Sequence, residues 1–266
     1  MSLSTNQHIN LSTKITLCTL KIMKALIFAA GLGTRLKPLT DAMPKALVPI
    51  AGKPLLEHVI EKLASSGFDE IIVNVHHFPD MIIDFLKERN HFGIRIEVSD
   101  ERDLLLDTGG GIQKAAWFFD DGKPFLVHNV DILSNINLGD LYQTHLKTNS
   151  LATLVASRRD TFRYLLFDEQ NKLQGWINEK TGETKPKNFS DISNFQKLAF
   201  AGMQILSPAV FDEMENFPEK FSIMDFYLSN VSSGKISGYT PENFKILDVG
   251  KLDVLDEAER FVLTFS

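Results

Sequence analysis

The chain has 266 residues, of which 44 % are hydrophobic and 23 % charged, and this ordinary globular mix excludes fibrous and disordered proteins. A formal net charge of −6 excludes a general nucleic-acid binder, and no run approaches the roughly 20 apolar residues that span a bilayer. The single cysteine, Cys18, cannot form an internal disulfide, so we expect a cytoplasmic protein without nucleic-acid or membrane partners, and the oligomeric state stays open.

The first 22 residues are polar and show no sustained hydrophobic period. They lack the apolar core of a signal peptide and the arginines of a transit peptide. We therefore expect a disordered extension over residues 1–22 and a single domain over residues 23–266.

From residue 24 to residue 131, short apolar runs alternate with helical patterns. Strands are expected at 25–30, 70–75, 94–98 and 125–130, and helices at 55–63, 81–86 and 112–119. Strands separated by helices of this kind form βαβ units, whose parallel sheet is covered by helices on both faces.

After residue 131 the pattern changes to strands joined by turns. Strands are expected at 151–157, 164–168, 173–178, 199–206 and 245–249, and helices at 211–214, 224–231 and 254–262. The sequence therefore predicts an α/β fold with a Rossmann-like, mixed but mainly parallel sheet flanked by helices. The parallel half, residues 23–131, is the expected nucleotide-binding half, and residues 132–266 are the expected acceptor half.

Positive charge is concentrated in one part of this acidic chain. Residues 24–53 carry a net charge of +4, whereas residues 54–266 carry −12. This asymmetry favours the binding of a small anion by the basic stretch, although a chance surface cluster is the alternative.

A glycine-rich segment, AAGLGTRL, follows the first expected strand. Gly31 and Gly33 allow a sharp turn and a close approach to a ligand, so that consecutive N–H groups can hold phosphate oxygens. It is neither a dinucleotide fingerprint, because Leu36 stands at the third glycine position, nor a Walker loop. A plain tight turn is equally compatible with this segment alone.

Two basic residues strengthen the phosphate interpretation. Arg35 follows the glycines, and Lys45 lies between Pro44 and Pro49, which restrict the backbone on both sides of it. A rigidly presented lysine near an arginine suits a pyrophosphate leaving group.

The stretch MKALIFAAGLGTRLKPLTDAMPKALVPIAGKP, residues 23–54, resembles the signature of the sugar-1-phosphate nucleotidyltransferase family. Two further segments are similar to family motifs in the same order: LDTGGGI at 106–112 and ILDVG at 246–250. Ala46 and Val130 depart from the pattern, because the family often has proline and glycine there. The resemblance implies the fold of the nucleotide-diphospho-sugar transferases, which is GT-A-like.

The resemblance also implies an enzyme that joins a nucleoside triphosphate to a sugar 1-phosphate and releases pyrophosphate, with Mg²⁺ as cofactor. It implies catalytic roles for Arg35 and Lys45, and Mg²⁺ binding by Asp131 and Asp248. It implies sugar contacts for Glu179 and Gly202. Nucleotide contacts are implied for Ala29, Gly31, Gly33, Thr34, Asp107, Gly109 and Gly110.

The segment LLDTGGGI is most similar to that of uridylyltransferases acting on N-acetylmuramate 1-phosphate, although those tend to have glutamate at the position of Asp107. Mannose-1-phosphate guanylyltransferase is the alternative, followed by glucose-1-phosphate thymidylyl- or cytidylyltransferase. A glycosyltransferase that uses a nucleotide sugar would need an Asp-x-Asp motif, and residues 129–131 read Asn-Val-Asp. A non-catalytic nucleotide sensor could have lost Arg35, Lys45 or an aspartate, and all are present.

Overall fold

The computed structural model describes residues 23–265, apart from 188 and 190, so the extension expected at residues 1–22 lies outside the described residues. Among the described residues, no helix is long and apolar enough to cross a membrane.

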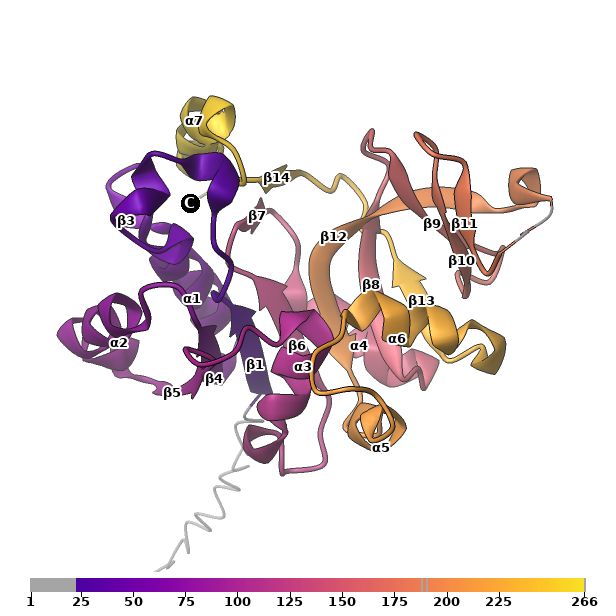
Figure 1. Cartoon of the computed structure of the whole chain (residues 1–266), viewed down its shortest axis with the longest axis horizontal. Helices are drawn as coiled ribbons and strands as arrows, with labels where there is room; N and C mark the ends of the chain where they lie inside the picture. Colours follow the sequence, from indigo (N-terminus) through magenta and orange to yellow (C-terminus); the bar gives the residue numbers. More distant parts are fainter. Residues whose placement is uncertain (1–22, 188, 190, 266) are drawn as a thin grey trace, which may run out of the picture.

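A ten-stranded mixed sheet runs through the molecule (Figure 1). Its main path is β11-β10-β9-β12-β6-β1-β4-β5, and β8 and β13 join it through β12. β6, β1, β4 and β5 are parallel, whereas β12 pairs antiparallel with β6, β8 and β9. The strands are β1 Met23–Phe28, β4 Phe68–Val75, β5 Arg95–Asp100, β6 Phe125–Asn129, β8 Ala152–Ser157, β9 Arg163–Phe167, β10 Leu173–Asn178, β11 Glu183–Lys185, β12 Gln196–Leu206 and β13 Ile236–Tyr239.

Helices cover both faces of this sheet. The helices are α1 Leu55–Ser65, α2 Pro79–Glu88, α3 Asp107–Lys114, α4 Leu138–Thr148, α5 Val210–Met214, α6 Ile223–Ser229 and α7 Leu255–Phe265. Side chains of β1 alternate between two cores: Ala25 and Ile27 pack with α1, α2 and α4, and Leu26 packs with α3, α5 and α6. The predicted fold class, a Rossmann-like mixed sheet flanked by helices, is confirmed.

Two small sheets complete the structure. β2 (Pro49–Ile50) pairs with β3 (Lys53–Pro54), and β7 (Ile132–Ser134) pairs antiparallel with β14 (Ile246–Asp248). The β7–β14 pair brings the end of the chain back beside the loop that follows β6.

Most of the predicted strands and helices are confirmed within two or three residues, but one helix is placed wrongly. The sequence predicts a helix at 112–119, whereas α3 ends at Lys114 and begins at Asp107, so it includes three consecutive glycines. Glycine disfavours a helix in isolation, and here tertiary packing overrides that preference. β7, α4, β11 and β13 were not predicted.

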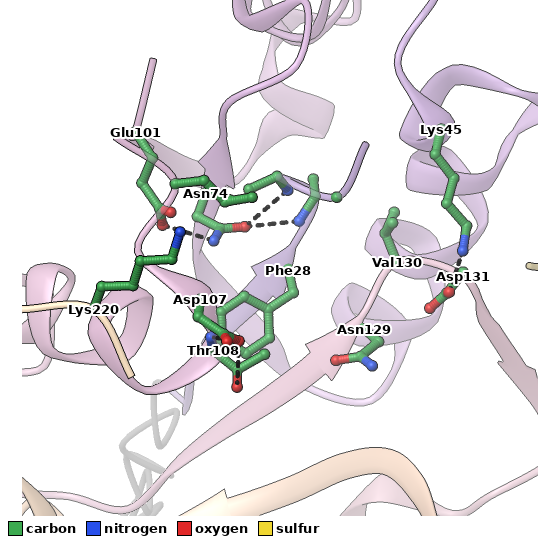
Figure 2. A pocket seen from close by; sticks show the side chains of 14 residues that line it. Phe28, Lys45, Asn74, Glu101, Asp107, Thr108, Asn129, Val130, Asp131 and Lys220 are labelled. Carbon is green, nitrogen blue, oxygen red and sulfur yellow. Dashed lines mark hydrogen bonds and ion pairs between the residues drawn. The ribbon is translucent and has the colours of Figure 1, made fainter. Parts of the chain in front are cut away.

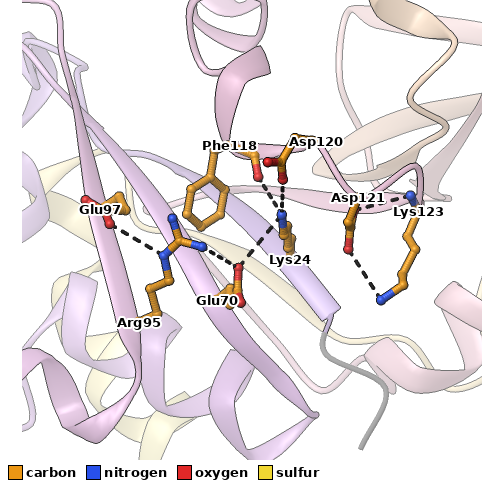
Figure 3. A network of polar contacts seen from close by, with 8 residues as sticks. All are labelled: Lys24, Glu70, Arg95, Glu97, Phe118, Asp120, Asp121 and Lys123. Carbon is orange, nitrogen blue, oxygen red and sulfur yellow. Dashed lines mark hydrogen bonds and ion pairs between the residues drawn. The ribbon is translucent and has the colours of Figure 1, made fainter. Parts of the chain in front are cut away.

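Ion pairs join the strands at the start of β1 (Figure 3). Lys24 Nζ donates to Phe118 O at 2.7 Å and to Asp120 Oδ1 at 2.8 Å, and Arg95 Nη1 lies 3.0 Å from Glu70 Oε2. Lys24 therefore stabilises the sheet at the end of β1 opposite Gly31, so its charge is not available to an anion there.

Candidate active site

A cavity of about 440 Å³ opens beyond the carboxyl ends of β1, β4 and β6, where ligands bind in open α/β sheets (Figure 2). Of the residues predicted from the sequence, it brings together Ala29, Gly31, Lys45, Asp107 and Asp131. Further lining residues are Phe28, Ala30, Asn74, Glu101, Leu105, Thr108, Asn129, Val130 and Lys220.

Lys45 and Asp131 form an ion pair at one end of this cavity (Figure 2). Lys45 is buried and lies in a short 3-10 turn that follows Pro44, so its side chain has little freedom. Asp131 lies two residues after the end of β6 and is partly exposed to the cavity. The pair presents one fixed ammonium and one reachable carboxylate, which can bind a phosphate and a cation respectively.

Asp248 lies next to Asp131 because β14 pairs with β7. Val249 N donates to Asp131 O at 2.8 Å, and Asp248 is the register partner of Ile132. Asp248 Oδ1 is a buried oxygen that has no hydrogen-bond partner among the described residues. Two aspartates on neighbouring segments, one of them with an unpartnered buried oxygen, provide the hard oxygen ligands that Mg²⁺ takes together with substrate phosphates.

Arg35 reaches the same region from the first glycine-rich loop. A Cβ built on Gly250 would lie 2.7 Å from Arg35 Nη2 and 2.6 Å from Asp248 Oδ1, so both side chains border that glycine. Arg35 is exposed and, in the described part of the chain, forms no ion pair. Its guanidinium is therefore free to bind an anion near Asp248.

The side chain of Thr40 fixes the backbone of the first glycine-rich loop. Gly33 has a φ of +63°, and Thr40 Oγ1 donates to Gly33 O at 2.9 Å. A Cβ at Gly33 would lie 2.8 Å from the Thr40 methyl group. Gly33 and Thr34 do not line the cavity, so their predicted nucleotide contacts stay predictions.

The second glycine-rich segment lies inside α3 rather than in a loop. Asp107, the first residue of the helix, borders the cavity with a φ of +62°, and its Oδ1 accepts from Thr108 N at 2.6 Å. Gly109 and Gly110 do not line the cavity; both of their N–H groups donate to Phe221 O. In this structure they bring the loop before α6 against α3.

The two residues predicted to contact sugar lie in different places. Gly202, in β12 with a φ of +72°, leaves room for Asn129 Nδ2, which would lie 3.0 Å from a Cβ there. The lack of a side chain at Gly202 therefore leaves space for Asn129, which lines the cavity. Glu179 does not line the cavity: it follows β10 and pairs with Lys197 at 2.8 Å.

His128 lies in β6 next to Asn129, the last residue of that strand. Burial lowers the pKa of His128 to about 4, so the ring is neutral near pH 7, and its Nδ1 is 2.8 Å from Asn129 O, to which it can donate.

Several residues that line the cavity were not predicted from the sequence. Asn74 could have been predicted as a site residue, because it is a polar residue in the otherwise apolar end of β4. Glu101 could also have been predicted, since it directly follows β5. No sequence pattern indicated Lys220, because only the packing of its loop on α3 brings it to the cavity.

The nucleotidyl transferase family matches residues 24–264. N-acetylmuramate alpha-1-phosphate uridylyltransferase of Caulobacter vibrioides is 31 % identical over 82 % of the chain and 88 % of its own length. Probable mannose-1-phosphate guanylyltransferase 1 of Oryza sativa is 34 % identical over 74 % of the chain and 53 % of its own length. The chain therefore belongs to the nucleotidyl transferase family and is an enzyme of the sugar-1-phosphate nucleotidyltransferase class.

The solved structures agree on the fold. HddC from Yersinia pseudotuberculosis, complexed with GMP-PN, has a TM-score of 0.70 with 24 % identity and covers 90 % of this chain and 99 % of its own.

Proposed function

We propose that the chain transfers the uridylyl group of UTP to N-acetylmuramate 1-phosphate and releases pyrophosphate. The similarity to the Caulobacter enzyme, which extends over 88 % of that protein, carries the choice of substrates. The rice guanylyltransferase is 34 % identical but matches over only 53 % of its length, so GTP with mannose 1-phosphate is the second candidate.

In the proposed reaction, an oxygen of the sugar phosphate attacks the α-phosphorus of the triphosphate. The new P–O bond forms as the bond to the bridging oxygen breaks, and pyrophosphate leaves with that electron pair. Lys45 would bind the α-phosphate, and Arg35 the β- and γ-phosphates. Both stabilise charge that builds in the transition state.

Asp131 and Asp248 would hold Mg²⁺, whose positive charge offsets the repulsion between the two phosphate groups when it is bound. No cluster of three or more His, Cys, Asp or Glu side chains occurs among the described residues, so substrate oxygens and water would complete the coordination. The Lys45 ammonium, which has three N–H donors, would bind the α-phosphate while it stays beside Asp131.

Gly31, after β1, and Asp107, at the start of α3, would contact the triphosphate and nucleoside in the cavity. Gly33 and Thr34, which do not line the cavity, would shape the loop that carries Gly31. Gly202 would act on the sugar side of the cavity through Asn129. For Glu179, which does not line the cavity, the sugar contact stays a prediction.

Pyrophosphate release tests this proposal. The purified chain would be assayed with UTP, GTP, dTTP and CTP against N-acetylmuramate, mannose and glucose 1-phosphates in the presence of Mg²⁺. We expect the highest kcat/KM for UTP with N-acetylmuramate 1-phosphate. A preference for GTP with mannose 1-phosphate supports the second candidate, and release only with a nucleotide sugar as donor indicates a glycosyltransferase.

A further inference from the structure

A chain of buried hydrogen bonds joins the two segments that border the nucleotide end of the cavity (Figure 2). Asn74 Oδ1 accepts from Ala29 N at 2.7 Å and from Ala30 N at 3.2 Å. Asn74 Nδ2 donates to Glu101 Oε1 at 2.8 Å, and Glu101 Oε2 accepts from Leu106 N at 3.1 Å. The chain therefore runs from the end of β1 to the start of α3.

Both side chains are enclosed. Asn74 is 2 % exposed and Glu101 is 1 % exposed. A Cβ on Gly111 would lie 2.9 Å from Glu101 Oε1, so α3 closes over the carboxylate. The backbone of Glu101 is anchored as well, because its N–H donates to Val75 O at 2.7 Å. A buried polar pair in this setting has one low-energy arrangement, and leaving either member unsatisfied is costly.

Asn74 also decides which backbone groups are free to meet a ligand. It occupies the N–H groups of Ala29 and Ala30, whereas no hydrogen bond in the described part of the chain uses those of Gly31 and Leu32. A neutral side chain that accepts two N–H groups therefore sets the point at which the phosphate-facing part of the loop begins.

We infer that Asn74 and Glu101 are positioning residues: together they fix the Gly31 loop and the Asp107 end of α3 at the separation that a nucleoside triphosphate requires. This inference rests on the proposed function, because it concerns the same cavity. It predicts that nucleotide binding requires a matched donor and acceptor at positions 74 and 101, and not these two residue types as such.

The chemistry of the pair allows a matched exchange. N74D places a carboxylate oxygen against Glu101 Oε1, and the two acceptors repel. E101Q leaves its amide NH₂ facing either Asn74 Nδ2 or Leu106 N, and both are donors. In the double variant N74D/E101Q the introduced amide donates to the introduced carboxylate and still accepts from Leu106 N. All four hydrogen bonds and the single negative charge are then restored, and only the bond between residues 74 and 101 has its direction reversed.

The test measures nucleotide binding and turnover in the wild type, both single variants and the double variant. Calorimetry with UTP, GTP, dTTP and CTP in the presence of Mg²⁺ gives affinity without requiring turnover, and pyrophosphate release gives KM for each substrate. We expect each single variant to weaken triphosphate binding about tenfold or more, with KM for the sugar phosphate within about twofold. The double variant should return to within about threefold of the wild type.

E97Q is the matched control, since Glu97 is an exposed carboxylate on β5 that pairs with Arg95, and it should leave binding unchanged. Equal losses in the double and single variants, or single variants that lose thermal stability without losing affinity per folded molecule, overturn the inference. Binding of a triphosphate by the wild type without pyrophosphate release overturns the proposed function alone. If none of the four triphosphates binds to the wild type, both are wrong.

Discussion

Gly31 in the first glycine-rich segment borders the cavity, and nothing lies within 4 Å of the point where its Cβ would stand. Gly110 in the second lies within α3, and its Cβ would lie 2.2 Å from Glu219 O. Gly31 leaves open space beside the cavity. Gly110, in contrast, allows α3 and the loop of Glu219 to pack closely, because it has no side chain to keep them apart. Two segments of similar composition therefore have different physical roles.

If the first glycine-rich segment and Lys45 take part in catalysis, K45A should lower kcat by about 10²–10³-fold. This is the effect of losing one preorganised hydrogen-bond donor to the charge that develops in the transition state. The reason is that Lys45 is the buried ammonium at the cavity end beside Asp131. Steady-state pyrophosphate release measures it. K87A, which removes an exposed lysine of α2, is the control and should retain full activity. Undiminished kcat in K45A would remove Lys45 from the mechanism.

The metal proposal extends the same comparison to the β7–β14 pair. D131N and D248N keep the side-chain size but remove a charge, and each should raise the Mg²⁺ concentration for half-maximal activity by at least about tenfold. Metal titration of the turnover rate checks this. D140N, on the first turn of α4, is the control. A titration curve unchanged in both D131N and D248N would rule out the two-aspartate site.

The packing role of the second segment predicts an effect on stability. G110A should lower the free energy of unfolding by about 1–3 kcal/mol, because its methyl group meets a backbone oxygen that cannot rotate away. G31A should change it by less than about 0.5 kcal/mol, since the site is open. Denaturant unfolding of both variants measures the difference. Similar losses in the two would show that the segments do not differ in this way.

The last expected effect depends on pH and comes from a core group outside both segments. His145 is bonded to Thr153 and Ser207, and burial lowers its pKa from 6.5 to about 4. Between those pH values the unfolded chain binds a proton that the folded chain does not. The free energy of unfolding therefore falls as the pH falls from 6.5 to 4, by up to about 1.4 kcal/mol per pH unit for this group.

H145Q should reduce that slope, and denaturant unfolding at several pH values measures it. H58Q, in α1, is the control, because the side chain of His58 is only partly buried. A slope in H145Q equal to that of the wild type would show that His145 is not neutral in the folded state.

Local pattern was sufficient for the parallel half of the sheet. Buried parallel strands are continuous apolar runs, so β1, β4 and β6 were predicted close to their observed bounds. It was insufficient for α3, where the glycines disfavour a helix locally and packing against Phe221 and Glu219 stabilises one. It also missed α4, although Asn137 caps that helix by accepting from Gly139 N and Asp140 N.

The sequence by itself determined the fold class, the family and the cluster of Lys45, Asp131 and Asp248 as phosphate and metal candidates. The first glycine-rich loop follows β1 and Asp131 follows β6, and these parallel strands present their ends at one edge of the sheet. Only the tertiary structure decided that Asn74 and Glu101 form one buried unit and that Gly109 and Gly110 face a loop. It also separated Glu179 from the cavity. Those relations depend on contacts between residues far apart in the chain, and local patterns do not encode them.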